Sequence, residues 1–231
     1  MTTSTSTLTA AATPILFADP RFEADDPRAA LARAATLAAA VIDAVQPEHL
    51  ALPTPCDELD VDGLLHHLAA VLPRIAQIGR GEAIAGPARI EGDVAFDQWP
   101  ALWLDGAREI ESVWSDDATL TQTVVLPWAT ESGAEALASY VNELSVHTWD
   151  LSRAIGVEPQ WEDDVLQVGL DGISHVLPAS GRTEMFEQMM ANVPPQFRPA
   201  PPFGDAVEVP ADAPLIDRLV AWNGRNPANP F

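Results

Sequence analysis

The pattern of apolar and polar positions predicts a chain built mainly from helices. Between residues 60 and 81, Val61, Leu64, Leu65, Leu68, Leu72 and Ile75 recur at the spacing that places side chains on one helical face. Trp103, Ile110 and Trp114 show a similar spacing further along the chain. Helices are expected over residues 26–45, 60–81, 96–115, 131–156, 163–177 and 214–224.

Capping residues and breakers set the ends of these helices. Asp26-Pro27 is a favourable N-cap and first-turn pair, Asp60 caps the next helix, and Gly156 ends the longest one. Pro73 is expected to kink its helix. The β-branched segment 121–129 predicts a short strand, and the proline-rich stretches 46–56 and 194–214 predict loops or extended chain. The fold class is therefore mainly all-α, with four principal helices that form a bundle.

Composition narrows the classes of partner. The chain of 231 residues has 34 acidic and 12 basic residues, and its formal net charge of −22 repels phosphate backbones and anionic lipid. We therefore expect no nucleic-acid and no membrane partner. No stretch has the roughly 20 apolar residues of a membrane span, and the start of the chain lacks the pattern of a signal peptide.

The cysteine content and the chain length suggest a cytoplasmic protein with one domain. A single cysteine, Cys56, excludes an internal disulfide framework. The Ser/Thr/Ala-rich start, residues 1–25, is expected to be flexible, and residues 26–231 are expected to form one domain that includes a C-terminal extension. Cys56 itself follows Pro55 without a visible activating neighbour, so we expect a small packed residue there and not a nucleophile.

The helical period separates two neighbouring histidines in the segment 60–81. His67 falls at the edge of the apolar stripe and can face the interior of a bundle. His66 falls almost opposite and is expected to face water. By itself, an inward histidine is more often a hydrogen-bonded residue at the edge of the core than a metal ligand.

A second candidate group lies on one strip of the segment 131–156. Glu143, His147 and Asp150 are four and three residues apart, so they are neighbours on one face of a helix. The small residues that continue the strip are expected to leave space beside it; they are Ala136, Ser139 and Ala154. Two interpretations of this strip stay open. It is either a polar strip inside the bundle or a solvated surface on which Asp150 and Arg153 form a local ion pair.

Two motifs resemble those of a known family. The segment "PTPCDELDVDGLLHHL" (53–68) is similar to the first histidine motif of the DinB/YfiT-like metal-binding family, in the branch related to mycothiol-dependent maleylpyruvate isomerase. "NELSVHTWDLSRAIG" (142–156) resembles the Glu-x-x-x-His helix of the same family, and the tail 202–227 resembles the C-terminal segment of this branch. The chain departs from the first motif at Leu59, where the family usually has tryptophan.

The resemblance implies a DinB-like four-helix bundle with a metal held by His67, Glu143 and His147. Two imidazoles and one carboxylate suit catalytic zinc, and nickel, iron or copper accept the same donors. Asp150 becomes a candidate to orient a ligand or act as a base, and Arg153 or Arg225 could hold an anionic substrate.

The resemblance also implies a second reactant. Relatives use a low-molecular-weight thiol such as mycothiol, and a metal that coordinates a thiol favours its nucleophilic thiolate form. We expect S-transfer to a small electrophile, or isomerisation of that electrophile. Because related proteins often dimerise, a homodimer is the candidate assembly. Two other readings stay open, which are a hydrolase or lyase that uses metal-bound water and a non-catalytic metal- or ligand-binding protein.

Overall fold

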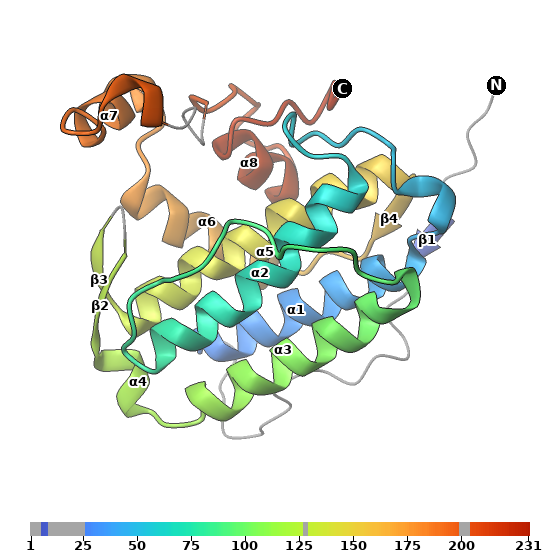
Figure 1. Ribbon diagram of the computed structural model, residues 1–231. Coiled ribbons are helices and arrows are strands. Elements are labelled where there is room, and N and C mark those ends of the chain that lie inside the picture. Colours follow the sequence, from blue (N-terminus) through green and yellow to red (C-terminus); the bar gives the residue numbers. More distant parts are fainter. Residues whose placement is uncertain (1–5, 9–25, 127–128, 199–203) are drawn as a thin grey trace.

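Four helices pack as a bundle that forms the body of the protein (Figure 1). The structure is a computed structural model and describes residues 6–8, 26–126, 129–198 and 204–231. The bundle consists of α1 (Pro27–Ala44), α2 (Val61–Gly79), α3 (Trp99–Trp114) and α5 (Gly133–Ile155). Because α1 and α2 each pack against both α3 and α5, the four helices enclose one apolar core. The expected four-helix bundle is confirmed.

Side-chain caps explain where the bundle helices begin. The carboxylates of Asp26 and Asp60 accept hydrogen bonds from backbone amides in the first turns of α1 and α2, and Ser132 forms a capping box with Glu135 at the start of α5. Gly156 ends α5 in the left-handed conformation that favours glycine. Helix α2 continues through Pro73 to Gly79 without a break.

Short strands and turns connect the helices. Strand β2 (Thr123–Val125) lies in the segment 121–129, where a short strand is predicted, and it pairs antiparallel with β3 (Thr130–Ser132), which the pattern does not predict. Residues 127–128 lie outside the described part. Strand β1 (Ser6–Leu8) pairs parallel with β4 (Val157–Pro159). Most of the segment 1–25, expected to be flexible, lies outside the described residues. The connections also include the short helices η1 (Pro47–His49), η2 (Phe96–Gln98) and α4 (Ala118–Thr121).

An outer layer covers the far side of α5. It consists of α6 (Asp163–Val176), which packs along α5, and α8 (Leu215–Trp222), which packs on both (Figure 1). The short helices α7 (Arg182–Met189) and η3 (Pro195–Phe197) lie between them in the sequence, and Figure 1 shows α7 at the upper left, away from α5. Helix α7 is not predicted by the sequence pattern, because it is short and only Arg182 in it is buried. The C-terminal extension ends in a helix as expected. Among the described helices, none is both long and apolar enough to cross a membrane.

Two of the small residues on α5 serve packing next to the candidate strip. A Cβ atom on Gly172 of α6 would lie 2.6 Å from the carbonyl carbon of Ala138 and 2.8 Å from the amide nitrogen of Ser139. Ala136 is fully buried in the core, and Ala154 packs against it. Ala136 and Ser139 are therefore covered by their neighbours, whereas the expectation that space is left at the candidate ligands themselves stays a prediction.

Candidate metal centre

His67 from α2 and Glu143 and His147 from α5 meet where these two helices face each other. The Nε2 atom of His67 lies 3.0 Å from Oε1 of Glu143, and Nε2 of His147 lies 3.6 Å from the same oxygen. The two imidazole rings are 4.7 Å apart and nearly perpendicular. The three donor atoms all lie within 4.8 Å of one another, so residues far apart in the sequence form one cluster.

Hydrogen bonds at Nδ1 orient both imidazoles in the same way. Nδ1 of His67 donates to the carbonyl oxygen of Ala88 at 2.8 Å, and Nδ1 of His147 donates to Oδ2 of Asp150 at 3.0 Å. Both partners are acceptors, so each Nδ1 carries a proton and the lone pair of a neutral ring sits on Nε2. Each ring therefore presents Nε2 toward Glu143, the arrangement that metal-ligating histidines commonly have.

The carboxylate that accepts the hydrogen bond from His147 belongs to a buried ion pair. Asp150 is fully buried, and its Oδ2 lies 2.8 Å from Nη2 of Arg225, which follows α8. Nε of Arg225 donates to Oδ1 of Asp150 at 3.3 Å, and Nη1 donates to the carbonyl oxygen of Asn223. The side-chain amides of Asn223 and Asn142 exchange hydrogen bonds of 2.7 and 3.1 Å. The C-terminal extension is thus tied to the helix that carries Glu143 and His147.

The charges in this region stabilise one another despite burial. Burial alone would raise the pKa of Glu143, but the charges and hydrogen bonds of His147 and His67 hold that pKa well below its ordinary value. Burial opposes the charged form of His147, yet Glu143 and Asp150 outweigh it and raise its pKa to about 9. Burial also acts against ionised Asp150, and Arg225 together with His147 nevertheless lowers the pKa of that carboxyl.

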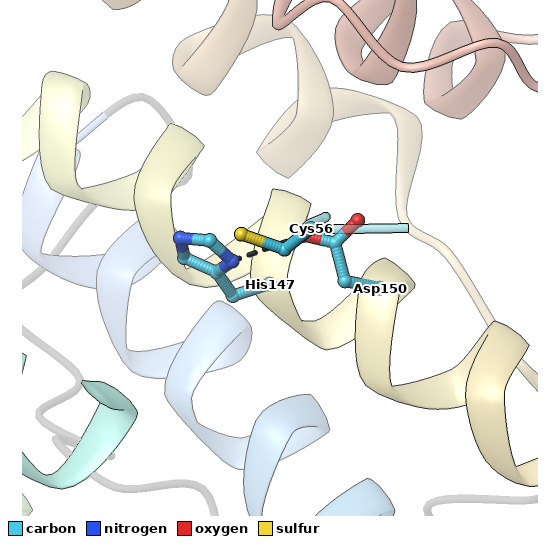
Figure 2. Close-up of side chains that lie close together, drawn as sticks. All are labelled: Cys56, His147 and Asp150. Atoms are coloured by element: carbon cyan, nitrogen blue, oxygen red, sulfur yellow. Dashed lines mark hydrogen bonds and ion pairs between the residues drawn. The ribbon is translucent and has the colours of Figure 1, made fainter. Parts of the chain in front are cut away.

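Cys56 lies on the other side of His147, where its thiol points into the space between the imidazole and the carboxylate of Asp150 (Figure 2). The sulfur, a donor nitrogen of His147 and an oxygen of Asp150 lie within 4.8 Å of one another. Burial raises the pKa of the Cys56 thiol to about 11, so the free thiol is protonated at neutral pH. Cys56 is therefore a weak nucleophile at neutral pH in the absence of a metal, and it lies beside the candidate centre.

The donor set of the first cluster fits a divalent metal ion. Two imidazoles and one carboxylate are the protein ligands of a well-known class of catalytic zinc site, which keeps a fourth position open. Both imidazoles already present Nε2, and Glu143 is held in its ionised form. The ligands that the sequence suggests are therefore close together and suitably oriented.

Two other sequence expectations differ from the structure. His66 was expected to face water, but its Nδ1 bonds to the carbonyl oxygen of Ile90 at 3.0 Å and its ring packs edge-on against Trp99. Asp150 was a candidate partner of Arg153, but it pairs with Arg225 instead. Arg153 lies 39% exposed, over the ring of Trp149 and 3.9 Å from Glu158. A catalytic role for Arg153 stays a prediction that its position does not favour.

Sequence reasoning did not find several parts of the site. The Ala88 carbonyl that orients His67 is a backbone atom of a loop, and side-chain patterns carry no signal for it. Asn223 is 81 residues from its partner Asn142. Arg225 was expected as a residue that holds an anionic substrate, but its guanidinium pairs with Asp150, 75 residues away. One signal pointed to a link between the tail and the site. The tail 202–227 resembles the same family as the two motifs that carry the candidate ligands.

Comparisons with known proteins agree with this fold. The crystal structure of the mycothiol-dependent maleylpyruvate isomerase matches with a TM-score of 0.54 and 12% sequence identity, over 71% of this chain and 73% of that one. An uncharacterized protein found in two strains of Mycobacterium tuberculosis is 29% identical over 203 residues, which cover 87% of this chain and 98% of the relative. No protein-family model matches the sequence.

Proposed function

We propose that this protein is a divalent-metal-dependent enzyme that uses a small thiol, such as mycothiol, for S-transfer to a small electrophilic substrate or for its isomerisation. The observation that carries the proposal is the convergence of His67, Glu143 and His147 with both imidazoles oriented through Nδ1. The fold likeness to an isomerase that depends on mycothiol supports the choice of thiol.

His67, Glu143 and His147 would hold the metal through Nε2, a carboxylate oxygen and Nε2. Zinc is the first candidate, because three ligands of this type with an open position are typical of catalytic zinc sites, and nickel or iron accepts the same donors. A bound ion of this kind lowers the pKa of a coordinating thiol and so supplies a nucleophile at neutral pH. The remaining chemistry belongs to the residues around it.

Asp150 acts in this proposal as a positioning residue for His147. Its two oxygens are already engaged by His147 and Arg225, and it is fully buried, so it is poorly placed to take a proton from a substrate. Arg225 keeps Asp150 ionised, and Asp150 keeps the proton of His147 on Nδ1. Because Arg225 comes from the C-terminal extension, we also propose that residues 26–231 act as one domain.

The decisive experiment combines elemental analysis with activity measurements. Purified protein is analysed for zinc, nickel and iron, and for co-purified thiol by mass spectrometry. Turnover of a panel of small electrophiles, including maleylpyruvate, is then measured with and without mycothiol. We expect one tightly bound divalent ion per chain at the cluster of His67, Glu143 and His147, and turnover that requires the thiol.

Variants of the ligands make this test specific. His67→Ala and His147→Ala should each lose this ion and the activity, whereas His175→Ala, an exposed histidine on α6, should keep both. The same amount of metal retained in the double variant of His67 and His147 would contradict the proposal. Turnover that is unaffected by removal of thiol would favour metal-activated water instead.

A further inference from the structure

A second group of metal-binding donors lies directly beside the first. Cys56, His147 and Asp150 place a sulfur, an imidazole nitrogen and a carboxylate oxygen within 4.8 Å of one another (Figure 2). We propose that these three residues form a second metal position for a thiophilic divalent ion, with the ring of His147 bridging the two positions as an imidazolate when both are filled. This goes beyond the proposed function, which uses only the first position.

The loop before α2 holds Cys56 in this place. The buried hydroxyl of Thr54 donates to the carbonyl oxygen of Leu59 at 2.6 Å and accepts a hydrogen bond from the amide of Cys56 at 3.1 Å. These contacts fix the backbone on both sides of the cysteine. The thiol points toward His147 and Asp150, which are polar neighbours that a merely packed cysteine does not need (Figure 2).

The imidazole of His147 has one nitrogen for each position. Nε2 faces Glu143 and His67, while Nδ1 faces Asp150. If a metal replaces the proton on Nδ1, the lone pair of Asp150 Oδ2 that accepted this proton becomes available to the same metal. Arg225 can keep its contacts with Asp150, because a carboxylate has about four acceptor positions.

Charge balance permits the second ion despite the nearby guanidinium of Arg225. A divalent ion that enters here displaces one proton from the Cys56 thiol and one from Nδ1 of His147, so the charge of the cluster does not change. A thiolate, an imidazole nitrogen and a carboxylate together suit zinc or cobalt. In an occupied tetrahedral site the sulfur and nitrogen are about 3.5 Å apart, so their present separation, which is at most 4.8 Å, has to close by no more than about 1 Å.

Titration with cobalt(II) tests this proposal, because a thiolate bound to cobalt gives a charge-transfer absorption in the near ultraviolet. Cys56 is the one cysteine in the sequence, so this band can come from no other residue. Metal-free full-length protein is titrated in a thiol-free reductant. We expect two cobalt ions per chain and a band that grows with one of them. Cys56→Ser should bind one ion without the band.

The variant His67→Ala separates the two positions. It should lose the first ion and keep the thiolate band, whereas His175→Ala should behave as the unaltered protein. The number of ions bound in His67→Ala therefore reports on the proposed catalytic centre, and the band reports on the second position. Absence of the band in both the unaltered protein and His67→Ala overturns the second position. A band that disappears in His67→Ala also overturns it, because Cys56 would then be a ligand of the first site.

A measurement on the unaltered protein covers the case in which Cys56→Ser fails to fold. Cobalt at the second position should protect Cys56 from alkylation by iodoacetamide at alkaline pH, where more of the free thiol is ionised, and the extent of labelling is measured by mass spectrometry. We expect at least a tenfold slower labelling at cobalt saturation. An unchanged labelling rate in His67→Ala saturated with cobalt would contradict the proposal as directly as a missing band.

Discussion

Asp150 and Arg225 form a buried ion pair in which Oδ2 and Nη2 are 2.8 Å apart, although 75 residues separate them in the sequence. The carboxylate is fully buried and the guanidinium is 13% exposed. Two charges are removed from water here, and each depends on the other for compensation. The contact therefore links the integrity of the C-terminal extension to the orientation of His147.

Removal of Arg225 should destabilise the fold strongly. In Arg225→Ala the carboxylate of Asp150 loses its main counter-charge while it stays buried, and breaking such a pair typically costs about 3–5 kcal/mol. We expect the free energy of unfolding from urea denaturation to fall by this amount. Arg225→Lys keeps the charge without the two-pronged contact and should lose less.

The double variant of Asp150 and Arg225 tests the cause. If Arg225→Ala is destabilising because it leaves a buried charge, the further change Asp150→Asn should recover part of the lost stability. A loss in Arg225→Ala that stays below about 1 kcal/mol would show that water or another cation compensates Asp150.

The sequence was sufficient for the bundle helices, and the family resemblance was needed to select His67, Glu143 and His147 as one set of candidate ligands. The caps at Asp26 and Asp60 and the stop at Gly156 are local features, and local features determine where helices begin and end. The helical period placed His67 at the inner edge of α2, and the structure brings its Nε2 atom to 3.0 Å from Glu143.

The sequence could not show which distant chain segments pack over each helix. A helical period tells which face of α2 carries His66, but not that Ile90 and Trp99 cover that face. The same limit explains the small residues of α5, where α6 takes up the space that Ser139 leaves. Pairing of Asp150 with Arg225 likewise requires the path of the C-terminal extension.

The close approach of α5 and α6 predicts that Gly172 cannot be enlarged. A methyl group at Gly172 would lie 2.6 Å from a backbone carbon of Ala138, and backbone cannot move aside as a flexible side chain does. We expect Gly172→Ala to lower the free energy of unfolding by about 1–3 kcal/mol. Ser174→Ala, on an exposed position of the same helix, is the matched control and should change it little. Equal stability of the two variants would mean that the helices can separate without cost.

Glu131 should limit stability at neutral pH. Its side chain is buried, its Oε2 has no hydrogen-bond partner among the described residues, and burial together with Glu135 raises its pKa. The folded state therefore binds this proton more tightly than the unfolded state, whose pKa is near 4.5, so stability is lost as pH rises through the raised folded value. Glu131→Gln should raise the melting temperature at pH 7.

The pH dependence distinguishes this effect from a general effect of the substitution. The difference in melting temperature between Glu131→Gln and the unaltered protein should shrink as pH falls below about 4.5, because both side chains are then neutral. Glu184→Gln changes an ordinary surface carboxylate on α7 and should show no such trend. A difference that is the same at pH 4 and pH 7 would exclude the charge of Glu131 as its cause.

The first metal equivalent should release a proton from His147. Glu143 and Asp150 raise the pKa of His147 to about 9 in the metal-free protein, so Nε2 carries a proton at pH 7 that a metal has to displace. We expect about one proton released at pH 7 and almost none at pH 10, measured by calorimetry in buffers of different ionisation enthalpy.

The apparent Kd of the first metal ion should fall about tenfold per pH unit up to about pH 9. Asp150→Asn removes one of the two carboxylates and should move this plateau to lower pH. An affinity that does not change between pH 7 and pH 9 would mean that His147 is already neutral, and that Glu143 and Asp150 do not control its proton.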